Sequence, residues 1–121
     1  MTIELAIPDD LTPANAPGLL RELSPDVRAA LLLDAAGALV ADSEDDPEKA
    51  EELARRVRDL VGAADAAAAD QPPEQLEVQV EGGSVFAARD PRHLLAAVTR
   101  KAALSSLMLY DMRAVLAALS R

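Results

Sequence analysis

The residues of this chain that could do chemistry are few, and they do not form a catalytic or metal-binding pattern. The only histidine is His93, and without a cysteine or a second histidine it has no partners for a zinc site. The consecutive acids Glu44, Asp45 and Asp46 lack the alternating ligands and the glycine of a calcium loop, so helix capping explains them better. The glycines at 82–83 are not part of a phosphate-loop motif. We therefore expect no catalytic residue, no metal and no cofactor.

Three arginines, Arg55, Arg56 and Arg58, form the densest basic cluster of the chain, on the exposed side of a predicted helix. One interpretation is pairing within the helix, because i,i+4 pairs of glutamate and arginine are common. The available acids are Glu51, Glu52 and Asp59. The other interpretation is a docking face for an acidic partner. Its candidate residues are Arg55, Arg56, Arg58 and Asp59.

Composition and charge narrow the class of protein. Half of the residues are hydrophobic but only 2% are aromatic, so the core must consist of Leu, Val and Ala. A core of such small side chains often gains stability by burying more surface in an oligomer. The net charge of −9 argues against nucleic acid and anionic membranes as partners, because both need a basic footprint.

The ends and the apolar runs of the sequence predict a cytoplasmic protein. The absence of cysteine fits a reducing cytosol. Residues 1–10 have neither the basic region nor the apolar run of a signal peptide, and the longest apolar run, 29–33, is far too short to span a membrane. We expect a tail over residues 1–11, with a short edge strand as the alternative, and a single domain over residues 12–121.

A long helix is the most clearly predicted element. Asp46 can cap it, Pro47 suits its first turn, and apolar residues follow at helical spacing over four turns. These apolar residues are Ala50, Leu53, Ala54, Val57, Leu60, Val61 and Ala64. Gly62 costs about 1 kcal/mol in a helix interior, yet the alanines that follow can extend the helix to about residue 69.

Two further patterns predict strands. Residues 28–34 and 38–42 are short apolar runs joined by a turn, with Gly37 in the left-handed position, and we prefer this hairpin to a single helix. Residues 76–81 alternate apolar and polar and are followed by a turn at the glycine pair and a second run over 84–89. A turn at an Asp-Pro pair and an apolar run over 94–98 come next, which predicts a three-stranded meander.

The first strand of the meander, residues 76–81, has two interpretations. It lies between neighbours within one subunit, or it forms the sheet edge and its free N–H and C=O groups template pairing with a second copy. In the second case Glu77 and Glu81 would lie near their symmetry mates, opposed by Arg89 or Arg28 if these lie on adjacent strands.

Two shorter helices complete the prediction. The first covers residues 17–23, after a start signal at Thr12 that a Pro-Gly pair interrupts. The last helix follows residue 104, with Ser105 or Ser106 as a possible cap. Asp111 interrupts its apolar stripe, and we expect that side chain to be partly exposed.

This order of elements resembles the roadblock/LC7 family, over about residues 12–120. The likeness rests on the hairpin Ala-Ala-Leu-Leu-Leu-Asp-Ala-Ala-Gly-Ala-Leu-Val-Ala-Asp, the long helix from Pro47, the meander beginning Leu-Glu-Val-Gln-Val-Glu-Gly-Gly, and the last helix ending Met-Arg-Ala-Val-Leu-Ala-Ala-Leu. No single motif is specific, and the order and spacing together carry the resemblance. The first helix departs from the family because it is short and carries a Pro-Gly pair.

The resemblance implies an α/β (α+β) roadblock/longin-like sandwich of order αββαβββα. A five-stranded antiparallel sheet would carry the long helix on one face and the terminal helices on the other. Family members usually dimerise by pairing strands edge to edge, with the long helices packed together, and here that strand would be residues 76–81. The candidate interface residues are Leu76, Glu77, Val78, Gln79, Val80, Glu81, Leu53, Val57 and Leu60.

The resemblance also implies a function. Bacterial members typically regulate or scaffold Ras-like small GTPases, often beside a sensor kinase, so we expect a non-catalytic homodimer that binds such a GTPase or a sensor-kinase-associated protein and modulates GTP hydrolysis. Two alternatives stay open. A secretion-chaperone-like module would be favoured by an exposed apolar groove, and a PAS-like small-ligand sensor would need a concave pocket with converging polar groups.

Overall fold

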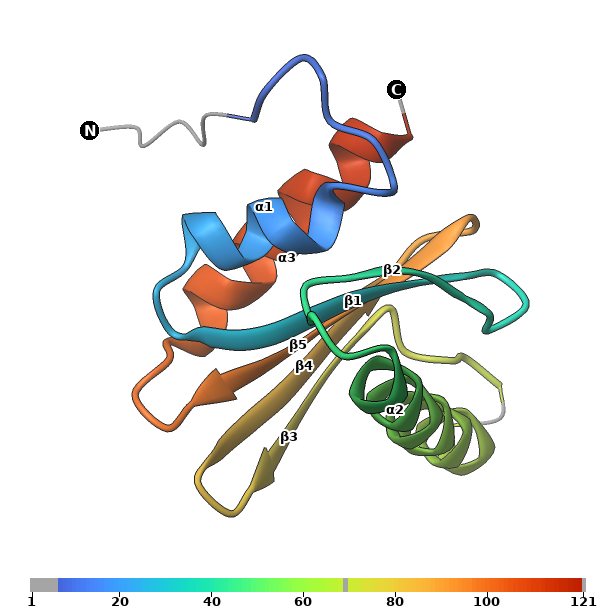
Figure 1. Ribbon diagram of the computed structural model, residues 1–121. Helices are drawn as coiled ribbons and strands as arrows, with labels where there is room; N and C mark the ends of the chain where they lie inside the picture. Colours follow the sequence, from blue (N-terminus) through green and yellow to red (C-terminus); the bar gives the residue numbers. More distant parts are fainter. Residues whose placement is uncertain (1–6, 69, 121) are drawn as a thin grey trace.

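The computed structural model of the chain describes residues 7–68 and 70–120, which hold three helices and five strands. The elements are α1 (Ala16–Leu23), β1 (Val27–Asp34), β2 (Leu39–Asp42), α2 (Pro47–Ala67), β3 (Gln75–Val80), β4 (Gly83–Arg89), β5 (His93–Arg100) and α3 (Ser105–Leu119). The strands form one antiparallel sheet in the order β2-β1-β5-β4-β3. Figure 1 shows α1 and α3 on one face of the sheet and α2 on the other. The predicted sandwich is confirmed.

Both predicted hairpins are present, and glycine is required at three of their positions. Gly37 and Gly82 have φ angles of 88° and 85°, in the left-handed region that favours glycine. Gly83 does not share this conformation, although the pair was expected to. It begins β4, and a Cβ there would lie 1.9 Å from the backbone oxygen of Thr99. Gly83 is therefore needed because β4 and β5 approach closely at that point.

The alternation of side chains along the central strands builds two separate cores. On the α1 and α3 face, Leu32, Phe86 and Leu95 pack with the two methionines of α3. On the α2 face, Leu31 and Leu33 pack with α2 and with cross-strand alanines of β4 and β5. Both cores are made of small aliphatic side chains with one buried aromatic ring, as the composition predicts.

The long helix begins as predicted. The carboxylate of Asp46 accepts hydrogen bonds from the backbone N–H groups of Glu48 and Lys49, at 3.0 and 3.4 Å, and Pro47 occupies the first turn. The helix ends at Ala67, so Gly62 lies inside it as expected. This N-terminal cap satisfies donors that the helix itself cannot pair.

The N-terminal segment and the two terminal helices differ in detail from the prediction. The alternative of a tail or an edge strand for residues 1–6 lies outside the described residues, and Leu11 packs against the first core. Helix α1 starts at Ala16, after a turn in which Thr12 and Asn15 bond each other. Helix α3 has Leu104 at its N-cap position and no side-chain cap. The hydroxyl of Ser105 instead donates to Glu77 on β3, at 2.8 Å.

Asp111 is buried, so the expectation of partial exposure is wrong. Its exposed fraction is 5%. Burial raises the pKa of this carboxyl above its ordinary value. Helical spacing places Asp111 within the apolar stripe of α3, next to Met108, Met112 and Val115, and this stripe faces the core.

Replacing Asp111 by asparagine should stabilise the protein at neutral pH. Because the folded-state pKa is raised, the protonated form favours folding; the cost of ionisation is absent below the unfolded pKa near 4 and grows as pH rises through the folded value. We expect Asp111→Asn to raise the free energy of unfolding by about 1 kcal/mol at pH 7 and to match the wild type at pH 3. Urea unfolding at both pH values measures this. The exposed Asp59→Asn is the control, and an equal effect at both pH values would contradict the assignment.

Candidate interaction surfaces

Strand β3 forms one edge of the sheet. It pairs with β4 on one side, and among residues 7–68 and 70–120 no strand pairs with its other side. Of the two interpretations of residues 76–81, the edge strand is therefore the one that the monomer adopts. An edge of this kind presents unpaired N–H and C=O groups that a further strand can use.

An apolar surface adjoins this edge on the α2 face. Val78 lies opposite Val85 on β4, which in turn lies opposite Val98 on β5. All three valines are half-buried, and Val80 is 45% exposed. The helix of the same face covers Leu31, Leu33 and Ala96 more fully. The valines therefore form a continuous apolar strip that the chain's own helix leaves partly open.

The three helical residues of the candidate interface do not share one environment. Val57 is only 2% exposed and belongs to the core under α2, so it has no surface to offer a second copy. Leu53 and Leu60 are half-buried, and Leu53 packs at the margin of that core. Helical spacing places all three on one stripe, but the sheet occupies the centre of the stripe and leaves only its sides available.

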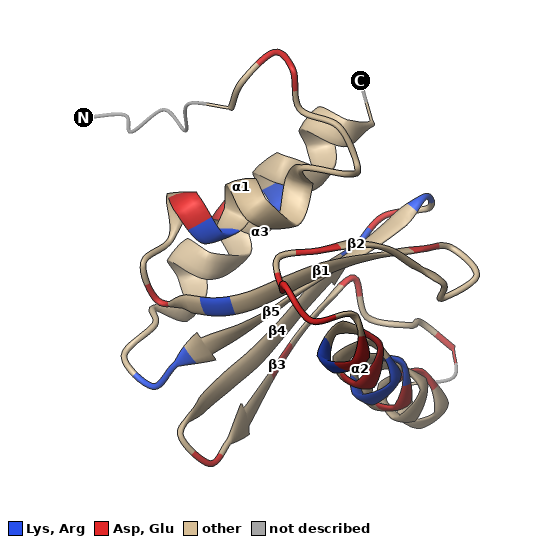
Figure 2. Cartoon of the chain, in the orientation of Figure 1, with Lys and Arg blue, Asp and Glu red and all other residues tan. Residues whose placement is uncertain are grey.

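The arginine cluster on α2 divides into two kinds. Arg56 pairs with Glu52 at 3.0 Å as predicted, and Arg55, Arg56 and Asp59 are exposed. Arg58 is engaged within the fold: its guanidinium donates to the backbone oxygen of Gly37 and to Glu51, both at 2.9 Å. The expected pairing of Glu51 with Arg55 is therefore wrong. Figure 2 shows acidic and basic residues side by side along α2.

Arg58 thus has a structural role that spacing within the helix could not reveal. It fastens α2 to the turn between β1 and β2, 21 residues away. A Cβ added at Gly37 would lie 3.3 Å from the Cδ of Arg58, so the arginine side chain packs closely against this turn. Of the candidate docking residues, Arg55, Arg56 and Asp59 remain available to a partner.

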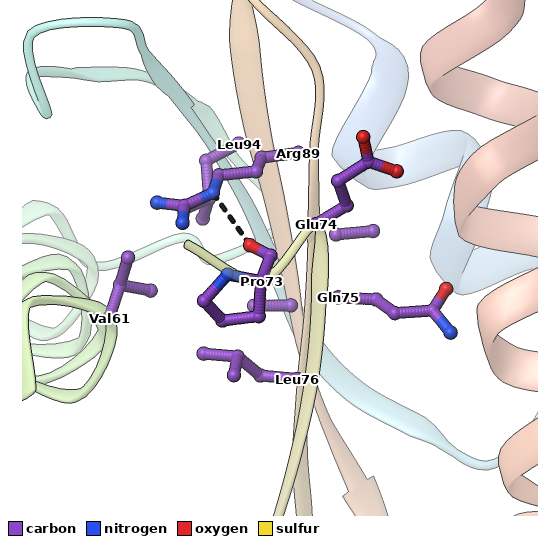
Figure 3. A pocket seen from close by; sticks show the side chains of 9 residues that line it. Val61, Pro73, Glu74, Gln75, Leu76, Arg89 and Leu94 are labelled. Atoms are coloured by element: carbon purple, nitrogen blue, oxygen red, sulfur yellow. Dashed lines mark hydrogen bonds between the residues drawn. The ribbon is translucent and has the colours of Figure 1, made fainter. Parts of the chain in front are cut away.

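An ion pair with two hydrogen bonds joins Arg89 to Asp65, and the sequence prediction missed it. Both Nη atoms of Arg89 donate to the Asp65 carboxylate, and Nε donates to the backbone oxygen of Pro73 at 2.9 Å (Figure 3). The hydrogen bond from Arg89 lowers the pKa of Asp65, and the same bond raises the pKa of Arg89. The pair holds the last turns of α2 and the following loop against β4.

The expectation that Arg89 opposes Glu77 or Glu81 is therefore wrong. In the register of β3 and β4, Glu77 lies opposite Phe86, and the backbone of Arg89 lies at the opposite end of the hairpin from Glu81. Its side chain is on the α2 face with Asp65, whereas Glu77 is on the α3 face and accepts from Ser105. A strand places alternate residues on opposite faces, so Arg89 and Glu77 cannot meet by register alone.

The two hollows that adjoin α2 in the described part of the chain lack a constellation for small-molecule chemistry. A cleft of about 390 Å³ lies between α2, the β1–β2 turn and the β4–β5 turn. Its two arginines, Arg58 and Arg89, are already paired with acids. The pocket drawn in Figure 3, between Val61 and the β3 edge, has room for about 10 Å³, which is no more than one water molecule. These features do not favour a PAS-like sensor.

His93 starts β5 at the rim of the larger cleft. Its Nδ1 is buried without a hydrogen-bond partner among the described residues. No group of three His, Asp or Glu side chains in the described part of the chain is placed to hold a metal ion. Within the same residues, no helix is both long and apolar enough to cross a bilayer.

Comparisons with known proteins agree with this architecture. The profile of the Roadblock/LC7 domain matches residues 19–100. Comparison with curated protein sequences gives no match.

Among solved structures, a Roadblock/LC7 domain from Streptomyces avermitilis superposes with a TM-score of 0.78 at 18% identity, covering 87% of this chain and 92% of that one. Myxococcus xanthus MglB superposes with a TM-score of 0.71 at 14% identity, over 88% and 92%. The gliding protein MglB of Thermus thermophilus gives 0.72 at 20% identity, over 88% and 84%. At such identities these likenesses establish the fold.

Breaking the Arg89–Asp65 pair should destabilise the protein at neutral pH, and the effect should fade in acid. Because the pKa of Asp65 is lowered, its contribution to stability is present above the unfolded pKa near 4 and is lost as pH falls through the folded value. We expect Asp65→Asn to lower the urea midpoint at pH 7 and to approach the wild type near pH 2. Arg89→Lys should not preserve stability, because a lysine cannot form the same bidentate contact.

Glu52→Gln is the matched control, because it removes an exposed pair within α2 and should change stability by only a few tenths of a kcal/mol. An effect of Asp65→Asn no larger than that of Glu52→Gln would contradict the structural role of the pair.

Proposed function

The chain belongs to the Roadblock/LC7 family, and we propose that it is a non-catalytic homodimer that binds a Ras-like small GTPase, or a protein associated with a sensor kinase, and modulates GTP hydrolysis by that GTPase. The proposal has two parts, a contact between copies and a docking face for the partner. The regulatory role rests on the family, and the two contact surfaces rest on the exposed parts of β3 and α2.

The observation that carries the homodimer is the open edge of β3 with its adjoining valines. The edge supplies backbone donors and acceptors, and Val78 and Val80 supply apolar area next to it. Backbone pairing and apolar burial then act together, as in other cases of strand addition. We propose that Leu53 and Leu60, which are half-buried on α2, add apolar area to the contact between copies.

The partner-docking face that we propose is the outer side of α2. Arg55 and Arg56 are exposed there. They provide positively charged groups in a chain whose overall charge is −9. Arg58 is excluded from the face because it is bound to Gly37 and Glu51. An acidic patch on the partner would complement the two exposed guanidinium groups.

A secretion-chaperone-like module is the second candidate, and one observation favours it. Leu104, Leu107 and Tyr110 are exposed along α3, which gives the terminal helices an uncovered apolar stripe. Such a stripe suits an extended apolar client. Binding of an unfolded client in preference to any GTPase would favour this candidate.

Val80→Arg should weaken the homodimer at least tenfold, because it places a charge in an apolar contact beside the paired edge. Sedimentation equilibrium over micromolar concentrations measures this. Val40→Arg is the matched control: Val40 is 42% exposed and Val80 45%, but Val40 lies on β2, at the other edge of the sheet. A wild type that stays monomeric at tens of micromolar, or a dimer that only Val40→Arg dissociates, would refute the proposed interface.

The double variant Arg55→Glu and Arg56→Glu should lose binding to the GTPase while remaining dimeric. Pull-down with purified Ras-like GTPases of the same genome, loaded with GDP or with a GTP analogue, measures binding, and phosphate release measures hydrolysis. Lys101→Glu, an exposed charge reversal in the turn before α3, is the control. If no GTPase binds in either nucleotide state, the proposed partner is wrong.

A further inference from the structure

The backbone of β3 directs its hydrogen-bonding groups in a fixed alternation. The N–H of Arg89 donates to the oxygen of Glu74 at 2.9 Å, and from there the register of β3 and β4 runs without a shift. In an antiparallel ladder the N–H and C=O of one residue point to the same neighbour, and those of the next residue point away. Leu76, Val78 and Val80 therefore bond β4, and Gln75, Glu77 and Gln79 direct their backbone groups to the free edge.

The side chains divide along the same alternation. Leu76 packs with the core under α2, so Val78 and Val80 share that face with it. Gln75, Glu77 and Gln79 lie on the α3 face, where Glu77 accepts the hydrogen bond from Ser105. The turn that follows begins with Glu81. The α3 side of the strand thus reads glutamine, glutamate, glutamine, and a further glutamate follows in the turn.

This pattern distinguishes the registers in which two copies could pair about a two-fold axis. Centred on residue 77, the two Glu77 side chains would lie directly opposite each other. Centred on residue 79, Glu77 would lie opposite Glu81, twice. Centred on Val78, Glu77 lies opposite Gln79, and Leu76 lies opposite Val80. Like charges directly opposite are destabilising, so of these three registers the one centred on Val78 avoids them. A shift of the centre to Leu76 or Val80 would also avoid them, but it would leave more of β3 (Gln75–Val80) unpaired.

We propose that two copies of this chain pair through β3 in one register, centred on Val78, and that the alternation of Gln75, Glu77, Gln79 and Glu81 selects it. This inference rests on the proposed homodimer and specifies its geometry. In this register Glu77 and Gln79 of each copy exchange backbone hydrogen bonds with Gln79 and Glu77 of the other. The two Val78 residues form the central pair without hydrogen bonds, in which side chains approach most closely.

Disulfide trapping can test the register directly, because the chain has no cysteine. In the proposed register the Cα atoms of the two residues 78 lie about 4.5 Å apart, within the range that a disulfide spans. Residues 77 of the two copies are diagonal neighbours, about 7–8 Å apart, which is beyond that range. The same holds for residues 79.

We expect Val78→Cys to form a covalent dimer under mild oxidation, and Glu77→Cys and Gln79→Cys to remain uncrosslinked when each is oxidised alone. An equimolar mixture of Glu77→Cys and Gln79→Cys should form the mixed dimer. Efficient crosslinking of Glu77→Cys alone, or of Gln79→Cys alone, would overturn the register. Circular dichroism of each reduced variant confirms folding.

The role of the charge pattern has its own test by sedimentation equilibrium. Gln79→Glu would place glutamates opposite each other twice, and we expect the dissociation constant to rise on the order of fivefold. The double variant Glu77→Gln, Gln79→Glu reverses the pattern, leaves a glutamate opposite a glutamine, and should restore the wild-type value. A double variant as weak as Gln79→Glu would overturn the selection by charge.

The outcomes separate this inference from the homodimer on which it rests. A wild type that is monomeric by sedimentation overturns both. A dimer that Val80→Arg dissociates, but that crosslinks at residue 77 or 79 alone, overturns the register and keeps the β3 interface.

Discussion

The structure depends on the pairing of β1, β5 and β4, whose small side chains allow helices to lie on both faces of one sheet. Ala30 and Ala97 face α1 and α3, whereas Ala87 and Ala96 face α2. Alanines let the layers approach closely, but they bury little area per residue. Larger side chains at a few positions, above all Phe86, Leu95 and the methionines of α3, supply the rest of the packing.

Because the alanines bury little apolar area, specific polar contacts hold the edges of the molecule. Arg58 fastens α2 to the first hairpin, and Arg89 fastens the end of α2 to β4 through Asp65. Both arginines bond a backbone oxygen as well as a carboxylate, so each joins segments that have few apolar contacts of their own. The two contacts also remove these arginines from the set that could meet a partner.

Strand β3 is both part of the sheet and its open edge. Strand β3 closes the hairpin with β4 and leaves its other edge open, and its valines are covered only in part. An open edge beside an apolar strip is a liability for a monomer and an asset for an oligomer. In the proposed dimer, Glu77 and Glu81 would disfavour some alternative registers, because these would place like charges together.

Local patterns in the sequence were enough to predict the elements, their order and the two hairpins. Asp46 and Pro47 mark the start of α2, Gly37 marks the first turn, and the alternation from Leu76 to Val80 marks β3, because capping, positive φ and period-two burial act between near neighbours. The family resemblance then predicted the sheet and its layers.

Contacts between distant segments were decided only by the tertiary structure. Spacing along α2 could not show that Val57 is buried by the sheet, that Arg58 turns to Gly37 or that Asp65 meets Arg89 across 24 residues. Local patterns also could not show that Ser105 bonds Glu77 instead of capping its helix. The sequence by itself determined which residues form each element and which face each one presents. What each exposed side chain meets depended on how the layers pack, because side chains far apart in the chain become neighbours only when the sheet is assembled.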